Sequence, residues 1–154
     1  MEIITYQDQY KPAVRELIFE IAEKELGHHS RNDRPDLSNI KEVYQTEKGN
    51  FWLALDSGKL VGTIGLREMG QGIGHFTRFY VDKDYRRKGI GSKLFFTLIE
   101  FAKKNNYKKI FLATASDQKA ANKFYTKVGL KRIYSPPDEL PHSSTDDIFY
   151  EIDF

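Results

Sequence analysis

Three consecutive cations and two glycines lie close together in the run from Asp84 to Ser92. The run reads Asp-Tyr-Arg-Arg-Lys-Gly-Ile-Gly-Ser and falls between a predicted strand and a predicted helix. The glycines let the backbone approach a ligand closely, and the start of a helix leaves several N–H groups without internal partners. With the cations and the positive end of the helix dipole, these donors form an anion site that suits a pyrophosphate better than a single carboxylate. The alternative is a solvated basic turn whose glycines serve geometry alone.

Two other phosphate-binding patterns can be compared with the sequence. The Walker pattern requires glycine, four residues, then glycine, lysine and serine or threonine, and residues 84–92 lack that spacing. Gly70-Gln71-Gly72 resembles the first part of a dinucleotide-binding fingerprint. However, His75 stands at its third glycine position and a strand follows in place of a helix, so we interpret this cluster as a hairpin turn.

A second group of residues follows a later predicted strand and ends at Gly129, which can cap a helix. The pattern Arg-x-x-Gly-x-Gly at residues 86–91 resembles the acetyl-coenzyme A loop of the GNAT superfamily of N-acetyltransferases. The pattern Ala-Asn-x-Phe-Tyr at residues 121–125, followed by Gly129, resembles the later helix of this family, which carries its tyrosine. Both motifs stand in the family's order and spacing, and the resemblance covers essentially the whole chain. Four positions differ from residues frequent in the family without removing a group that the chemistry needs: Lys83 for proline, Arg87 for glycine, Asp117 for asparagine and Leu130 for phenylalanine.

The resemblance implies a site for acetyl-coenzyme A (acetyl-CoA). Its pyrophosphate is expected on backbone N–H groups, with Arg86 fixing the loop. The pantetheine arm is expected beside the strand end Phe79-Tyr80-Val81, where it pairs with the main chain as an added strand does. A backbone N–H near Val81 would then stabilise the oxyanion that develops on the thioester. The N–H groups expected at the pyrophosphate belong to Arg87, Lys88, Gly89, Ile90, Gly91 and Ser92.

The resemblance also assigns roles to two side chains of the later helix. Tyr125 is expected to donate its phenolic proton toward the coenzyme sulfur. A phenol pKa near ~10 and a thiol pKa near ~8.5 make full transfer uphill by about 2 kcal/mol, so a hydrogen bond to the departing thiolate can replace full protonation. Packing of Tyr125 in the core, together with Phe124 and Val128, is the non-catalytic alternative. Asn122 offers its amide to the pantetheine or to the turn before its helix, and a purely local bond is its alternative.

The acceptor has to attack as a neutral amine. A lysine-like amine with a pKa of ~10.4 is mostly protonated at pH 7, and neutralising it costs about 4–5 kcal/mol. A general base, direct or through water, is therefore expected. Candidates on the meander and near the first helix, which line the acceptor side in this family, are Glu68, His75, Glu23 and His28. A solvated charge is the alternative for the glutamates, and a half-buried strand position for His75. The adjacent His28 and His29 have no carboxylate at ligand spacing, so no metal is expected.

Acceptor specificity is expected in two polar segments, residues 27–36 and 135–145, that are long enough to border the site. The leading hypothesis is direct transfer of acetyl from acetyl-CoA to a primary amine, in a small molecule or a peptide, within a ternary complex. No covalent enzyme intermediate is expected, because the chain has no cysteine and no serine–histidine pattern. A non-catalytic coenzyme A sensor is the alternative, and a small kinase fits the motifs less well. Acids near the first segment suit a cationic amine and equally an ordinary helix surface: Glu20, Glu23, Glu25, Asp33 and Asp36.

The spacing of apolar residues predicts the elements that position these groups. They follow the order β-α-α-β-β-β-α-β-α-β-β. An antiparallel meander followed by β-α-β units implies an α/β fold with a mixed sheet and helices on its faces, and the resemblance implies the GNAT acyl-CoA N-acyltransferase fold. One domain over residues 1–154 is expected. Strands are predicted at 2–6, 51–55, 60–67, 75–81, 110–114, 131–134 and 148–154, and helices at 12–26, 37–46, 89–104 and 118–128.

Composition excludes several other classes of protein. The 154 residues include 24 lysines and arginines against 22 aspartates and glutamates, a net charge of +2, and no cysteine. The chain thus lacks a polycationic field, and no nucleic-acid partner is expected. The absence of cysteine excludes a disulfide scaffold, a thiolate nucleophile and a cysteine-ligated metal. Neither a secretory signal nor a bilayer-spanning run is visible, so no membrane association and a cytoplasmic location are expected. Since similar proteins form dimers, a homodimer is a further expectation.

Overall fold

The computed structural model describes residues 1–25, 27, 34–140 and 146–154 of the chain. Its strands form one mixed sheet in the order β1-β2-β3-β4-β5-β7-β6. β4 and β5 are parallel, and the other neighbouring strands are antiparallel. The strands are β1 (Glu2–Thr5), β2 (Asn50–Asp56), β3 (Lys59–Gly70), β4 (Ile73–Val81), β5 (Lys109–Thr114), β6 (Lys131–Ile133) and β7 (Ile148–Asp153). The predicted meander and mixed sheet are confirmed.

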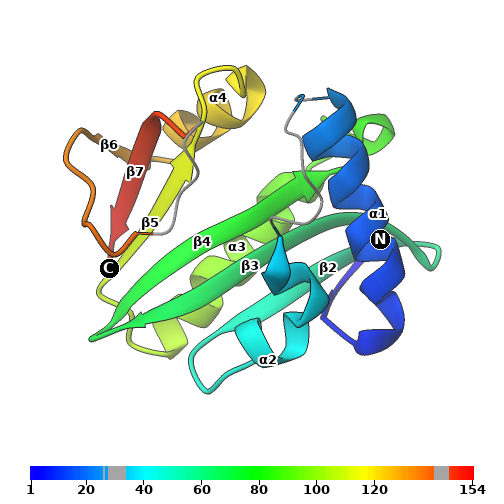
Figure 1. Ribbon diagram of the computed structural model, residues 1–154, viewed down its shortest axis with the longest axis horizontal. Coiled ribbons are helices and arrows are strands. Elements are labelled where there is room, and N and C mark those ends of the chain that lie inside the picture. The colour runs from blue at the N-terminus through cyan, green and yellow to red at the C-terminus, as the bar shows by residue number, and fades with distance from the viewer. Residues whose placement is uncertain (26, 28–33, 141–145) are drawn as a thin grey trace.

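Helices cover both faces of this sheet. α1 and α2 lie on one face, here called the front face, and α3 crosses the opposite, rear face (Figure 1). α4 packs into the same rear core as α3. The α-helices are α1 (Lys11–Phe19), α2 (Ile40–Tyr44), α3 (Ile90–Lys104) and α4 (Lys119–Lys127). Shorter turns are the 3-10 elements η1 (Asp8–Tyr10), η4 (Pro35–Ser38) and η5 (Lys83–Tyr85), and the π-helical η2 (Glu20–Glu25).

The period-2 alternation of β2 divides its apolar side chains between two cores. Trp52 and Ala54 belong to the rear core, which α3 and α4 close. Phe51, Leu53 and Leu55 belong to the front core, which α1 and α2 close. The central strands are therefore buried on both faces, and this explains their almost continuous apolar runs.

The first two predicted helices differ from those observed. α1 does not continue regularly to Gly27, because it passes at Glu20 into the π-helical turn η2. The predicted helix over 37–46 is two short elements, since Asn39 between η4 and α2 has φ −135° and ψ 46°, outside the helical region. Pro35 stands at the start of η4, where its missing N–H costs no hydrogen bond.

β4 and β5 separate soon after they begin. They are paired over three residues only, and the last pair is His75 with Phe111. β4 then bulges: Thr77 faces Gly65 and Tyr80 faces Thr63, so one extra residue lies on β4. Arg78, within the bulge, has φ +54°. A bulge bends its strand and increases the twist, and the two strands open into a V toward their carboxyl ends (Figure 1).

Candidate active site

The loop that carries the first motif is a turn that delivers the chain into α3. Asp82 accepts a hydrogen bond of 2.9 Å from the Asp84 N–H and thereby closes η5. Gly89 precedes the helix with φ +81°, a left-handed conformation that favours glycine, and no side chain caps the helix start. The first helical bond runs from Lys93 N to Gly89 O, at 3.1 Å. The N–H groups of residues 90–92 therefore have no partner inside the helix, as the anion-site interpretation requires.

Arg86 and Arg87 shape this loop in different ways. Arg86 Nε donates to the carbonyl of Val81 at 2.9 Å, and its guanidinium also forms a double contact with Glu25 at 2.9 and 3.2 Å. It thus ties the loop both to the end of β4 and to η2. Arg87 has φ +64°, so the position where the family often has glycine needs a left-handed backbone here as well.

The end of β4 presents a free edge toward β5. Asp82 donates its N–H to Val61 O at 2.8 Å, and the adjacent pair is Gly62 with Val81. Because bonded and non-bonded pairs alternate in an antiparallel ladder, the N–H and carbonyl of Val81 point away from β3. The carbonyl is occupied by Arg86, which leaves the Val81 N–H facing the opening of the V.

Phe79 connects this edge with both motifs. A Cβ added to Gly91, in the first turn of α3, would lie only 3.2 Å from Phe79 Cζ, so the helix start rests directly on this ring. The centroid of the Phe79 ring also lies 6.2 Å from that of Tyr125 and 5.4 Å from that of Phe124. The glycine-rich loop, the end of β4 and α4 therefore meet around one aromatic side chain.

Tyr125 is 4% exposed and surrounded by rings. Its ring lies 5.8 Å from Phe76 and 5.4 Å from Tyr150, measured between centroids. Burial, followed by the proximity of Tyr80 and Tyr150, raises the pKa of the Tyr125 hydroxyl well above its ordinary value. The phenol therefore remains a proton donor at any physiological pH. Its burial among these rings also fits the packing alternative.

The side-chain amide of Asn122 forms hydrogen bonds within the protein. Its Nδ2 donates to the carbonyls of Ala115 and Gln118, both at 2.9 Å, and its Oδ1 accepts from the Tyr150 hydroxyl at 3.0 Å. Of the two uses predicted for this amide, the structure shows the turn before the helix. Tyr150 was missed by sequence reasoning, because its partner lies 28 residues away and only the alternation of the last strand marks it as inward-facing.

The structure separates the predicted base candidates. Glu68 is exposed beside the β3–β4 hairpin, opposite Gly74, whose Cβ position faces Tyr107 on the rear face. Glu68 therefore points to the rear face of the sheet, and its role as a base stays a prediction. Glu23 is paired with Arg34 at 2.8 Å, and His28 lies outside the described residues.

His75 remains on the front face and is 7% exposed. Its Nδ1 is buried and has no hydrogen-bond partner in the described part of the chain. Burial, and then the charges of Arg67 and Arg78, lower the pKa of its imidazole to about 4. His75 is therefore neutral at pH 7 and a weak base.

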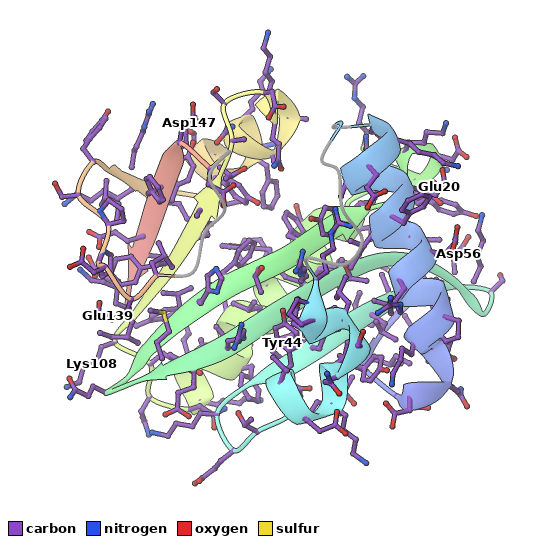
Figure 2. All side chains as sticks on the ribbon, viewed as in Figure 1. Glu20, Tyr44, Asp56, Lys108, Glu139 and Asp147 are labelled. Atoms are coloured by element: carbon purple, nitrogen blue, oxygen red, sulfur yellow. The ribbon has the colours of Figure 1, made fainter. Side chains whose placement is uncertain are left out.

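A buried ionic cluster on the front face was not predicted. Arg78 donates from Nε and Nη2 to Asp36 at 2.9 and 2.7 Å, and the Tyr44 hydroxyl donates to Asp36 at 2.7 Å. Figure 2 shows Tyr44 where α2 packs on the sheet. Thr63 Oγ1 donates to the Arg78 carbonyl at 2.8 Å, so the bulge of β4 is held through both its side chain and its backbone. Asp36 thereby anchors the segment before α2 to the strand end.

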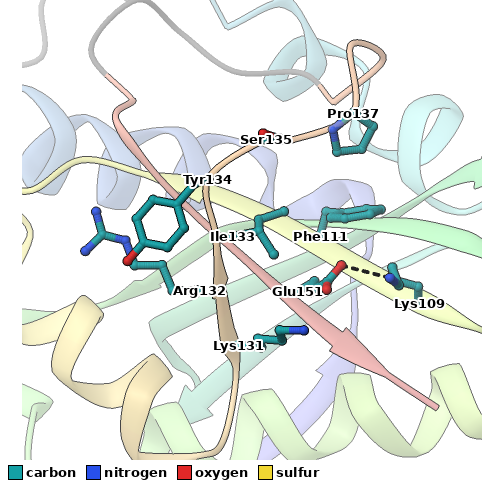
Figure 3. Close-up of a pocket in the computed structure, with 9 residues that line it drawn as sticks. All are labelled: Lys109, Phe111, Lys131, Arg132, Ile133, Tyr134, Ser135, Pro137 and Glu151. Carbon is teal, nitrogen blue, oxygen red and sulfur yellow. Dashed lines mark ion pairs between the residues drawn. The ribbon is translucent and has the colours of Figure 1, made fainter.

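An open pocket of about 580 Å³ lies over β5, β6 and β7, outside both motifs. The ion pair between Lys109 and Glu151, at 2.9 Å, forms part of its wall (Figure 3). Within the described residues, no helix has the length and apolar composition that crossing a bilayer demands. Likewise, no three acidic or histidine side chains of the described ranges gather closely enough to hold a metal ion.

A mixed sheet that opens between two parallel strands, with unpaired helix-start N–H groups at the opening, is the acyl-CoA N-acyltransferase fold. The family model described as Acetyltransferase (GNAT) family matches residues 12–130. The chain therefore belongs to the GNAT family of acetyltransferases.

Known proteins agree with this assignment. An acetyltransferase structure of the GNAT family from Staphylococcus aureus Mu50 superposes with a TM-score of 0.95 at 34% identity and covers 99% of this chain and 98% of that one. N-acetylaspartate synthetase of Xenopus tropicalis is 32% identical over 133 residues, 82% of this chain and 49% of that protein. Probable N-acetyltransferase camello of the same frog is 37% identical over 109 residues, 69% of this chain and 50% of that protein. The chain thus spans about half the length of these two relatives. PaiA N-acetyltransferase of Thermoplasma acidophilum, solved with coenzyme A, shares the fold with a TM-score of 0.78 at 19% identity, over 99% of this chain and 98% of that one.

Proposed function

We propose that the chain transfers an acetyl group from acetyl-CoA to a primary amine by direct attack. One observation carries this proposal: Phe79 lies between the unpaired N–H groups at the start of α3 and the buried phenol of Tyr125. A ligand whose phosphates rest on those N–H groups and whose arm follows the free edge of β4 would end beside Tyr125. The structures of similar fold solved with coenzyme A or acetyl-CoA support this choice of ligand.

Acetyl transfer requires three functions from this chain: binding of the pyrophosphate, stabilisation of the oxyanion and stabilisation of the departing sulfur. The N–H groups of residues 90–92 bind the pyrophosphate, helped by the helix dipole and the cations of residues 86–88. The Val81 N–H faces the opening and stabilises negative charge on the carbonyl oxygen under attack. The C–N bond forms first and places the negative charge on this oxygen; the C–S bond then breaks as the carbonyl re-forms, and Tyr125 donates a hydrogen bond to the sulfur that leaves. Its raised pKa favours a hydrogen bond over full proton transfer.

The proton of the attacking amine needs a separate route. His75 faces the acceptor side, but with a pKa of about 4 it holds a proton poorly. Glu68 points to the rear face beside the β3–β4 hairpin, and Glu23 is already paired with Arg34. We therefore assign removal of this proton to solvent water. A homodimer and a cytoplasmic location remain predictions.

Two measurements test the proposal. Calorimetry with acetyl-CoA and coenzyme A is expected to give micromolar or tighter binding, and absence of binding would contradict it. Release of free thiol is then followed over a panel of amino acids, polyamines, aminoglycosides and peptides. Binding without thiol release from any amine would favour the coenzyme A sensor instead.

A further inference from the structure

The acids near the acceptor side are not available to a cationic substrate. Their number suited a cationic amine at the level of sequence. In the structure each of the four that are described is already paired with a cation of the chain, at 2.7 to 2.9 Å: Glu20 with Lys24, Glu23 with Arg34, Glu25 with Arg86 and Asp36 with Arg78. Asp33 lies outside the described residues. These pairs neutralise the negative charge that would have attracted a polyamine.

Arg67 is a cation without such a partner in the part of the chain that the structure describes. It lies on β3 directly opposite His75 of β4. Its Cζ stands 6.0 Å from the centre of the Tyr44 ring, a cation–π contact. Within the described ranges it forms no ion pair with a carboxylate, although it is half-buried. A half-buried guanidinium that contacts no acid of the described segments is suited to an anion from outside the chain.

The surroundings of Arg67 carry a net positive charge. Two guanidinium groups, those of Arg67 and Arg78, accompany the single carboxylate of Asp36, and all three act on Tyr44. Burial lowers the pKa of the neighbouring His75, and the charges of the two arginines lower it further, while Asp36 opposes them. One added carboxylate would bring the cluster to neutrality.

The cluster also lies where an acceptor would enter. His75 is the last residue of β4 that pairs with β5, so it marks the vertex of the V. Arg78 belongs to the bulge that follows it. Thr77, between them, faces Gly65, whose place on the front face is filled by the rings of Tyr44 and Phe51. An amine that approaches the open edge of β4 from the front therefore meets the cluster at the half-buried Arg67, opposite His75 at the vertex.

We propose that the acceptor is an amine that also carries a carboxylate, and that Arg67 determines this specificity by binding that carboxylate. The inference rests on the proposed acetyl transfer. It disfavours polyamines, whose additional ammonium groups would be repelled by the unpaired guanidinium.

Matched acceptors test the substrate class. Glycine, β-alanine and L-aspartate are compared with their amides and with spermidine, by thiol release at saturating acetyl-CoA. We expect kcat/KM to be about 10- to 100-fold higher for the carboxylates. The amides lose their amine proton more easily, so this preference would oppose intrinsic reactivity. Peptides with an acidic second residue are tested in the same assay. A higher kcat/KM for these peptides than for the free amino acids would identify a peptide as the source of the carboxylate.

The variant Arg67→Gln tests whether Arg67 binds the carboxylate of the acceptor. Its expected effect is an about 10- to 100-fold rise in KM for the carboxylate amine, with KM for acetyl-CoA unchanged. Arg132→Gln is the matched control, because Arg132 also stacks on an aromatic ring, Tyr134 at 5.1 Å, but lies on the edge strand β6. It should change neither constant.

Binding of succinate to the coenzyme A-loaded protein tests the site without turnover. Calorimetry should detect binding by the wild type and by Arg132→Gln, and not by Arg67→Gln. Equal rates for acids and amides, or succinate binding that survives Arg67→Gln, would overturn the inference while leaving the proposed acetyl transfer intact. Failure of acetyl-CoA itself to bind would instead remove the proposed function.

Discussion

The hydroxyl of Tyr150 on β7 donates a hydrogen bond of 3.0 Å to Oδ1 of Asn122 on α4. Asn122 in turn holds the turn before α4 through two backbone carbonyls, and the Tyr150 ring packs against Tyr125. One residue of the last strand thus supports the candidate catalytic phenol by a hydrogen bond to its helix and by contact with its ring. The second motif is built as much by β7 as by α4.

Replacement of Tyr150 by phenylalanine should separate these two supports. The ring stays and the Asn122 amide oxygen loses its donor, which should lower the free energy of unfolding by about 1 to 2 kcal/mol. Urea unfolding measures this loss. A double-mutant cycle that combines Tyr150→Phe with Asn122→Ala should give an interaction free energy of similar size. Additive effects of the two substitutions on the free energy of unfolding would mean that the hydrogen bond contributes little.

Removal of the Tyr125 hydroxyl should affect the transfer step selectively. Tyr125→Phe keeps the buried ring and is expected to lower kcat about 100-fold, because the departing thiolate loses its donor. Acetyl-CoA affinity by calorimetry should stay near that of the wild type. Tyr134→Phe serves as the control, since Tyr134, directly after β6, is 81% exposed. An unchanged kcat in Tyr125→Phe would reduce Tyr125 to a core residue.

Gly89 can be compared with another left-handed glycine. Gly89 and Gly58 have φ values of +81° and +83°, and neither has an atom near an added Cβ. Alanine at either position should therefore cost a similar 1–2 kcal/mol of backbone strain, roughly. Only Gly89→Ala should also weaken acetyl-CoA binding, by about tenfold, because it distorts the loop before α3. Calorimetry of both variants measures the difference, and equal affinities would contradict the loop assignment.

His75 should make the fold sensitive to mild acid. The unfolded imidazole takes up a proton below pH ~6.5, whereas the folded one does so only near its pKa of about 4. The unfolded state therefore binds more protons between these values, and stability should fall as the pH decreases across this window, by at most about 3 kcal/mol. Nuclear magnetic resonance titration should show His75 neutral at pH 5.5. Arg67→Gln should raise its pKa, and an imidazole that titrates near pH 6.5 in the wild type would contradict the burial argument.

The contribution of the Asp36–Arg78 pair to folding stability should also be lost at low pH. Burial alone would raise the pKa of Asp36, but the hydrogen bonds and charge of Arg78 outweigh it and hold the pKa below its usual value. Its contribution is thus present above pH ~3.9 and is lost as the pH falls through the lower folded value. Asp36→Asn should cost about 3 kcal/mol near pH 7, because it leaves a buried guanidinium without its carboxylate.

Glu20→Gln is the control for this variant. It breaks a pair whose side chains are 59% and 50% exposed, and it should cost under about 0.5 kcal/mol. Urea unfolding from pH 3 to pH 7 measures both. Equal effects of the two substitutions would show that the buried pair adds no more than a surface one.

Local signals in the sequence determined the elements and the two motifs. The helical spacing of apolar residues predicted α3 over 89–104, and it spans Ile90–Lys104. Alternation and turn residues predicted the meander of β2, β3 and β4. The glycine that precedes α3 was also readable, because a left-handed backbone at a strand–helix junction favours that residue. Such signals are legible because they depend on neighbours within a few positions.

Long-range contacts were decided only by the tertiary structure. Asn122 and Arg78 contact partners that lie 28 and 42 residues away in the chain, and no periodic pattern in the sequence predicts these contacts. The sequence shows the acids near α1 only as a concentration of negative charge, and it does not predict which cations neutralise them. The direction of Glu68 toward the rear face follows from strand register, which pairing across the sheet sets. Charge, burial and the free edge of β4 depend on which distant segments meet, and that is a property of the packed sheet and not of any single run of residues.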